Sequence, residues 1–326
     1  MKTVVMGYHT MGGLGFGALL RHGFDVKAVF THRDDPHEEI WWESLAERAM
    51  AKGVPVYYPE SLKDPKWGEI IRSIAPDFIF SFYFRFMIPP DILGIPKMGA
   101  LNLHGSLLPR YRGRAPVNWV LVNGETETGV SLHYMVAKPD AGNLVDQERG
   151  PIAFDDTART LFTKLEAAAA RLLDRTLPKL KTGTAPSTPM DLTKGSYFGG
   201  RKPEDGRIDW RWPALRIYNL VRAVTHPYPG AFTTLRGRKL FVWWGVSKTD
   251  VTADGAERER RGPQVGAVET VLAAGAVTRV DASGVLVAAG QGFVHLKRCQ
   301  FEGAPEEEAA AWAASAGVVP GTVLGV

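Results

Sequence analysis

The chain has 326 residues, 45% of them hydrophobic and 23% charged, which is typical of a globular protein and long enough for two domains. Its apolar runs, such as 78–84, are too short to cross a membrane, and a net charge of +4 permits phosphate or nucleic-acid partners without requiring them. Cys299 is the only cysteine, which excludes an intrachain disulfide and a metal site built on several thiolates, so no metal is expected.

The first half of the sequence alternates strand-like runs with helical stretches. The N-terminus leads directly into the first strand without a signal-like stretch, so a cytoplasmic location is expected. Strands are predicted at residues 3–6, 26–31, 54–58, 77–82 and 100–103, and helices at about 15–22, 41–52 and 67–74. This alternation predicts a mostly parallel, Rossmann-like sheet with helices on both faces, whose ligands bind beyond the carboxyl ends of the strands.

A hairpin and a long helix are predicted to complete the first domain. The hairpin strands are 128–135 and 143–149, and the helix follows a capping sequence at 155–157. The helix is predicted to end near Leu177, because Pro178 follows.

The composition changes after residue 186, where Gly, Pro, Ser, Thr and Lys become frequent. We therefore divide the chain into a catalytic domain at 1–186, a linker at 187–205 and a second domain at 206–326. The second domain has predicted helices at 213–223 and, rich in Ala, near 306–314, and strands at 232–235, 240–244, 265–269, 285–289 and 293–298. Short strands at this spacing predict a small antiparallel barrel of the OB-like kind.

The first strand is followed by a glycine-rich stretch, with glycines at positions 7, 12, 13, 15 and 17. Their spacing does not give the G-x-G-x-x-G pattern of dinucleotide-binding folds, and Thr31 ends the second strand where an acidic residue would hold a ribose. An NAD-dependent oxidoreductase is therefore disfavoured. The glycines are predicted to let the backbone turn tightly near a ligand.

The segment 100–119 carries the most informative side chains. A strand has a period of two, so Asn102 and His104 lie on one face, with His104 at the carboxyl end. The loop that follows carries three arginines: Arg110, Arg112 and Arg114. This pattern fits the edge of an active site, and on spacing alone it fits equally well a satisfied core histidine beside a solvated basic loop.

These residues also carry a family resemblance. The run Asn102-Leu-His104-Gly-Ser-Leu-Leu-Pro109, then Tyr111-Arg-Gly113 and Asp140-Ala-Gly142, resembles the formyltetrahydrofolate-dependent formyltransferases. The likeness is greatest to those that act on UDP-4-amino-4-deoxy-L-arabinose, and it extends from Met1 through the second domain. Such an enzyme would belong to lipid A modification and polymyxin resistance.

The resemblance implies a catalytic set of Asn102, His104 and Asp140. Formyl transfer to an amine passes through a tetrahedral oxyanion, which the Asn102 amide can stabilise by hydrogen bonding. The His104 imidazole suits the movement of a proton from the amine to the folate nitrogen. Asp140 would stabilise the imidazolium and orient it, although such a residue can also be only a turn cap.

The resemblance also implies 10-formyltetrahydrofolate as the co-substrate. Its expected contacts are Phe86, Met87, Ile88, Arg114, Val136, Ala137, Lys138, Pro139 and Asp140. Pro139 has no backbone N–H, so it can contact the folate only as an acceptor or by packing. Arg110 and Arg112 are available for the pyrophosphate of a nucleotide sugar.

The main alternative is methionyl-tRNA formyltransferase, which shares the fold, the donor and the catalytic set. Its relatives carry a basic insertion after the second strand, whereas residues 33–48 here are rich in Asp and Glu, so nucleic acid is not the expected partner. A non-catalytic binding protein is disfavoured because all three catalytic positions are present. The arabinose enzyme is usually fused to a dehydrogenase domain, and this sequence ends at Val326 without one, so a different nucleotide-linked amino sugar stays open.

Overall fold

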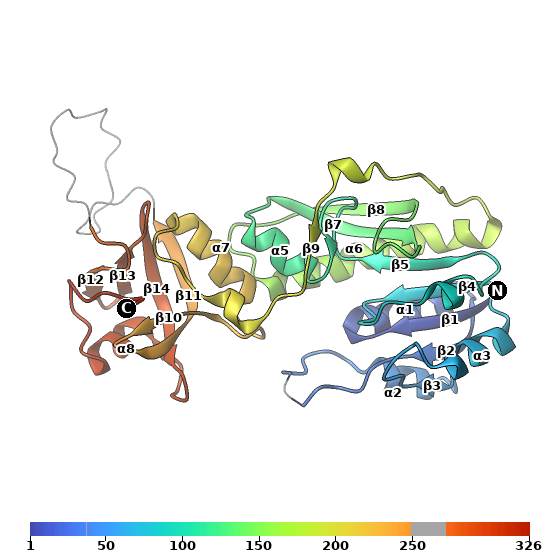
Figure 1. The fold of residues 1–326 in the computed structure, drawn as a ribbon, viewed down its shortest axis with the longest axis horizontal. Coiled ribbons are helices and arrows are strands. Elements are labelled where there is room, and N and C mark those ends of the chain that lie inside the picture. Colours follow the sequence, from blue (N-terminus) through green and yellow to red (C-terminus); the bar gives the residue numbers. More distant parts are fainter. Residues whose placement is uncertain (37, 249–271) are drawn as a thin grey trace. The chain divides into compact units, whose positions relative to one another are not determined.

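The computed structural model describes residues 1–36, 38–248 and 272–326 and divides into two compact units (Figure 1). The first unit consists of residues 1–117, 126–153 and 160–200. The second consists of residues 118–125, 154–159 and 201–326. Within the described part of the chain, no helix is long and apolar enough to cross a membrane.

The first unit is built on a seven-stranded sheet in the order β3-β2-β1-β4-β5-β7-β8. Its strands are β1 (Lys2–Gly7), β2 (Asp25–Phe30), β3 (Val56–Tyr57), β4 (Phe78–Phe82), β5 (Ala100–His104), β7 (Glu127–Tyr134) and β8 (Leu144–Pro151). The strands from β3 to β5 are parallel, whereas β7 is antiparallel to both β5 and β8. The predicted mostly parallel sheet and its antiparallel hairpin are confirmed.

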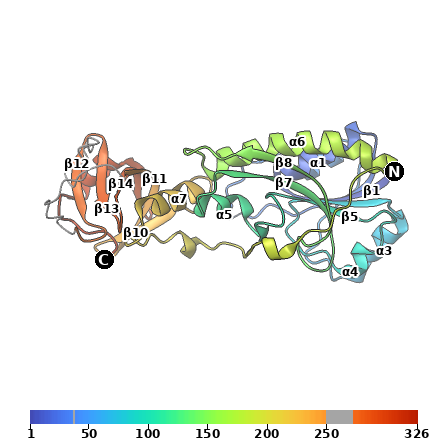
Figure 2. The same ribbon diagram turned by 90° about the horizontal axis from the view of Figure 1, so that it is seen from above.

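Helices cover both faces of this sheet. They are α1 (His9–Arg21), α2 (Leu45–Met50), α3 (Pro65–Ile74), α4 (Pro90–Leu93) and α6 (Ala158–Thr182), whereas most of α5 (Pro116–Val122) belongs to the second unit. Figure 2 shows α1 and α6 on one side of the sheet and α3 and α4 on the other. On the second side, Ile71 of α3 and Ile92 of α4 pack into a buried cluster that includes Ala100 of β5.

The glycine-rich stretch after β1 is helical, and its predicted role in a tight turn near a ligand was wrong. α1 already begins at His9, so Gly12, Gly13, Gly15 and Gly17 lie inside the helix. A Cβ atom on Gly15 would lie 2.5 Å from the ring of Phe82. Glycine therefore lets the helix approach the sheet closely, at the cost of a lower helix propensity.

α6 is longer than predicted, because Pro178 lies inside it instead of ending it. The helix runs to Thr182, and Gly183 follows with a φ of +70°. Thr184 N donates to Lys179 O over 2.9 Å, which satisfies one of the last carbonyls. The left-handed glycine therefore ends the helix.

The segment assigned as a linker, 187–205, is partly ordered by the first unit. It contains two short 3₁₀ helices, η1 (Leu192–Lys194) and η2 (Pro203–Gly206), and the strand β9 (Tyr197–Phe198). β9 pairs in parallel with β6 (Arg112–Gly113), which lies in the arginine loop after β5. This segment therefore supports the loop that the sequence marked as functional.

The second unit contains a six-stranded sheet with antiparallel pairing. The path is β10-β11-β14-β13-β12, with β15 also paired to β14. Its elements are α7 (Ala214–Val224), β10 (Ala231–Leu235), β11 (Arg238–Lys248), β12 (Val277–Asp281), β13 (Gly284–Ala288), β14 (Phe293–Phe301), β15 (Glu307–Glu308) and α8 (Ala309–Ser315). The predicted antiparallel second domain is confirmed. The strand predicted at 265–269 lies outside the described residues, and β12 and β15 were not predicted.

Candidate active site

The site begins with two neighbouring strands of the first unit. Asn102 and His104 lie on the same face of β5 as Ala100, following the period of two. The register of the β5–β7 pair puts His133 directly opposite Asn102. Side chains of directly opposed residues on antiparallel strands are near neighbours, so the two strands bring an amide and two imidazoles together.

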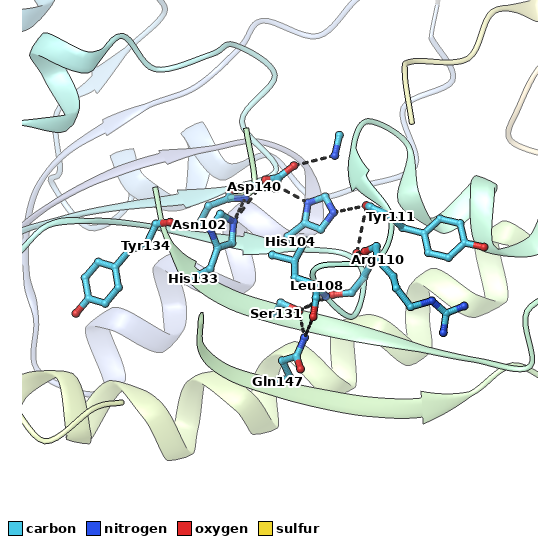
Figure 3. A network of polar contacts seen from close by, with 12 residues as sticks. Asn102, His104, Leu108, Arg110, Tyr111, Ser131, His133, Tyr134, Asp140 and Gln147 are labelled. Carbon is cyan, nitrogen blue, oxygen red and sulfur yellow. Dashed lines mark hydrogen bonds and ion pairs between the residues drawn. The ribbon is translucent and has the colours of Figure 1, made fainter. Parts of the chain in front are cut away.

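Asp140 joins this group from the loop after β7. The loop is held close to the strand, because a Cβ atom on Gly142 would lie only 2.0 Å from Tyr134 O. Asp140 has a φ of +47°, a left-handed conformation that Asp tolerates better than most residues. Its Oδ1 lies 3.7 Å from Nδ1 of His104 and 3.4 Å from Nε2 of His133 (Figure 3).

The environment of Asp140 favours the carboxylate over the acid. Burial by itself raises the pKa of this group. The nearby His104, together with the hydrogen bond that Gly113 N donates to Oδ2 over 2.8 Å, lowers the pKa of Asp140 well below its usual range. The site therefore contains a fixed negative charge beside two imidazoles. Among the described side chains, no group of three or more His, Cys, Asp or Glu residues is arranged to hold a metal ion.

The hydrogen bonds of His104 define its tautomer. Its Nε2 lies 2.7 Å from Tyr111 O. Because a carbonyl oxygen can only accept, Nε2 carries a proton, and the neutral ring has its lone pair on Nδ1. At 3.7 Å from Asp140 Oδ1, Nδ1 is too far away for a direct hydrogen bond but close enough for charge stabilisation. Nδ1 is therefore the ring atom that can exchange a proton.

A buried polar network supports the loop between His104 and Tyr111. Ser106 Oγ donates to Arg110 O over 2.7 Å, and Ser131 Oγ donates to Ser106 O over 2.6 Å. Gln147 Nε2 donates to Leu108 O over 2.9 Å (Figure 3). Sequence reasoning missed Ser131, His133 and Gln147. Their hairpin had been recognised, and only the strand register, which the sequence does not give, brings them to β5.

The three arginines of the loop differ in their surroundings. Arg110 is exposed, with its guanidinium 5.8 Å from the centre of the Tyr111 ring. Arg112 is half-buried, and its Nε is buried without a hydrogen-bond partner in residues 1–36, 38–248 and 272–326. Arg114 is exposed, and its backbone N donates to Phe198 O over 3.0 Å.

The residues expected to contact folate follow β4 and β7. Phe86 and Met87 are exposed, whereas Ile88 is buried in the cluster under α3 and α4. Met135 packs against the same cluster, so the segments after the two strands share one core. Beyond Met135, three residues are exposed and two are half-buried: Val136, Ala137 and Lys138, then Pro139 and Asp140.

Solved structures with the same fold include two N-formyltransferases and a longer protein, HypX. An N-formyltransferase from Helicobacter canadensis, in complex with folinic acid and dTDP-3-aminofucose, is 19% identical with a TM-score of 0.65, over 91% of this chain and 99% of that one. WlaRD, a sugar 3N-formyl transferase solved with dTDP and 5-N-formyl-THF, is 18% identical with a TM-score of 0.65, over 93% and 98%. HypX from Aquifex aeolicus, in complex with tetrahydrofolic acid, is 15% identical with a TM-score of 0.58, over 95% of this chain and 46% of HypX. At these identities the likeness shows the fold.

Two family models match the sequence itself. The formyl transferase model matches residues 18–177, and the formyl transferase C-terminal domain model matches residues 201–317. The first match contains Asn102, His104, His133 and Asp140. Since the two matches follow one another and leave little of the sequence uncovered, this chain belongs to the formyl transferase family and is a formyltransferase.

Proposed function

We propose that this enzyme transfers a formyl group from 10-formyltetrahydrofolate to the 4-amino group of a UDP-linked amino sugar. The proposed acceptor of the formyl group is UDP-4-amino-4-deoxy-L-arabinose, a sugar nucleotide used in lipid A modification. The observation that carries the chemistry is the contact of Asp140 with His104 beside the amide of Asn102. The folate and nucleotide-sugar complexes of two proteins with the same fold support the choice of co-substrate and of acceptor class.

In this proposal His104 moves the proton. The amine nitrogen attacks the formyl carbon, and its proton passes to the lone pair on His104 Nδ1, because Nε2 already donates to Tyr111 O. The C–N bond to the folate then breaks, and Nδ1 returns the proton to the folate nitrogen. Asp140, 3.7 Å from Nδ1, stabilises the imidazolium between these two steps. A base and acid of this kind contributes roughly 10²–10⁴ in rate.

Asn102 stabilises the negative charge that develops on the formyl oxygen. Its side chain is partly accessible, unlike the buried rings of His104 and His133 beside it. An N–H donor that is already oriented stabilises an oxyanion without reorganisation at the moment of reaction. Loss of such a donor costs about 10²–10³ in turnover.

The arginine loop is proposed to bind the pyrophosphate of the nucleotide sugar. A buried guanidinium N–H without an acceptor costs free energy, and the Nε of Arg112 is such a group in the described part of the chain. An anionic oxygen would satisfy it, and Arg110 is exposed nearby in sequence. The folate is proposed to lie along Phe86–Ile88 and Val136–Asp140, with Arg114 as a further contact.

The deciding experiment measures tetrahydrofolate release with a panel of acceptors. The purified enzyme is given 10-formyltetrahydrofolate and either UDP-4-amino-4-deoxy-L-arabinose, other UDP- or dTDP-linked amino sugars, or initiator methionyl-tRNA. We expect the rate of tetrahydrofolate release to be highest with UDP-4-amino-4-deoxy-L-arabinose. Turnover with tRNA alone would overturn the proposed acceptor, and preference for a dTDP-sugar would correct the nucleotide.

A further inference from the structure

His133, which sequence reasoning missed, contacts two members of the proposed catalytic set. Its side chain is only 1% exposed, and its Nε2 faces both the amide of Asn102 and the carboxylate of Asp140 (Figure 3). Nε2 is 3.2 Å from Asn102 Nδ2 and 3.4 Å from Asp140 Oδ1. Any role of this ring in the reaction rests on the proposed function.

The other ring nitrogen of His133 fixes the tautomer. Nδ1 lies 2.8 Å from Tyr134 O, and a carbonyl can only accept, so Nδ1 carries a proton. The neutral ring then has its lone pair on Nε2, facing the Asn102 NH₂ group at hydrogen-bond distance. A doubly protonated ring would instead put two donors 3.2 Å apart.

The charges in the cluster also favour a neutral His133. Asp140 supplies one negative charge, and both imidazoles face the same oxygen, Oδ1. Two imidazolium groups around one buried carboxylate would leave an uncompensated positive charge, so protonation of one ring disfavours protonation of the other. In the proposed reaction the positive charge is needed on His104, which leaves His133 neutral.

We propose that neutral His133 is a positioning residue that accepts a hydrogen bond from Asn102 and thereby orients its amide. The hydrogen bond holds the NH₂ group, and not the carbonyl, on the side of Nε2. The second N–H of the same amide then stays available for the oxyanion, and a hydrogen-bonded chain of this kind polarises its members cooperatively. Without the acceptor, the amide is free to rotate and can present its oxygen to the oxyanion.

Two substitutions at this position separate orientation from packing. His133→Leu removes the acceptor and keeps an apolar side chain of similar size, whereas His133→Gln can return an acceptor oxygen near the position of Nε2. Leu132→Met is the matched control, because Leu132 is fully buried on the same strand with its side chain on the opposite face. A volume-conserving change at Leu132 tests whether disturbance of β7 alone lowers turnover.

The expected result for His133→Leu is a loss of about 10- to 100-fold in kcat. This loss is smaller than the loss expected when the oxyanion donor is removed completely. KM for both substrates should change less than about threefold, because the amide acts in the transition state. His133→Gln should recover most of the turnover, and Leu132→Met should resemble the wild type. In the wild type, ¹⁵N NMR of the histidine rings should find His133 protonated at Nδ1 and not at Nε2.

Each failure has a distinct meaning. Wild-type turnover in His133→Leu beside an inactive Asn102→Ala would overturn the inference alone. A proton on Nε2 of His133 in the wild type would also overturn it, as would a loss of turnover in Leu132→Met equal to that in His133→Leu. Wild-type turnover in Asn102→Ala would overturn the proposed function, and this inference with it.

Discussion

Each of the two units contains a buried cluster of charged groups around histidine, and the two clusters are arranged oppositely. In the first unit, His104 and His133 lie beside the carboxylate of Asp140. In the second unit, His295 on β14 lies near the cations Lys297 and Arg279, with Asp281 as the acidic group. Lys297 Nζ is 3.5 Å from Nε2 of His295. Because an ammonium group can only donate, this nitrogen carries no proton.

The surroundings of each cluster decide whether a positive charge can form on a ring. The carboxylate of Asp140 is stabilised in its charged form and can balance an imidazolium. Burial, followed by the charges of Lys297 and Arg279, lowers the pKa of His295 to about 4. Histidine alone is therefore a weak functional signal, whereas histidine beside a buried carboxylate is suited to proton transfer.

The largest effects are expected in the first cluster. Asn102→Ala and His104→Ala should each lower turnover by about 10²–10³ while the protein remains folded, because they remove the oxyanion donor and the proton carrier. His295→Gln, which changes a buried histidine of the other unit, should keep wild-type turnover. Steady-state kinetics with circular dichroism of each variant measures this. Equal losses of turnover in all three variants would show that any disturbance of these polar side chains lowers activity, and would contradict a catalytic role of Asn102 and His104.

Asp140→Asn should have a smaller effect on turnover, about 10- to 100-fold, because the reacting groups remain. The acidic limb of the pH–rate profile should move to lower pH. The carboxylate stabilises the imidazolium, so its removal means that more acid is needed to protonate the base. A profile recorded from pH 5 to 9 tests this, and an unchanged limb with lowered turnover would assign Asp140 a structural role.

The contrast between the two units also bears on what the sequence could predict. The parallel strands, the hairpin and the positions of Asn102 and His104 on one face follow from local periodicity, which acts within a few residues. The position of His133 opposite Asn102 depends on the register between β5 and β7, and register is set by the whole sheet. β9 supports the arginine loop by pairing with β6, which is far away in sequence. Local sequence patterns do not reveal such a pairing, so residues 187–205 were interpreted as a linker. The glycines of α1 were misread because close packing and tight turns select the same residue.

Gly113 tests whether the position of Asp140 depends on this long-range support. Gly113 has a φ of +100°, and a Cβ atom there would lie 2.1 Å from Phe198 O. Gly113→Ala should push β6 away from β9 and weaken the hydrogen bond from Gly113 N to Asp140. We expect a loss of about 1–3 kcal/mol in stability and a several-fold lower turnover. Gly199→Ala is the control, because a Cβ atom there meets nothing within 4 Å. Equal behaviour of the two variants would contradict the role of the β6–β9 pair.

The smallest expected effect lies in the second unit and is visible only in stability. The pKa of His295 in the folded protein, about 4, is below the ordinary histidine value of 6.5, so the unfolded chain binds a proton more readily between these values. The contribution of neutral His295 to stability is complete above pH 6.5 and is lost as the pH falls towards 4. Between pH 7 and pH 5 this loss should be about 1–2 kcal/mol.

The variant His295→Gln cannot titrate at this position, so its melting temperature should fall less than that of the wild type between pH 7 and pH 5. The pKa of His32 in the first unit is lowered in the same direction, but His32 is present in both proteins and affects them equally. Thermal unfolding of both proteins at the two pH values measures the difference, and an equal fall would mean that His295 titrates normally in the folded chain.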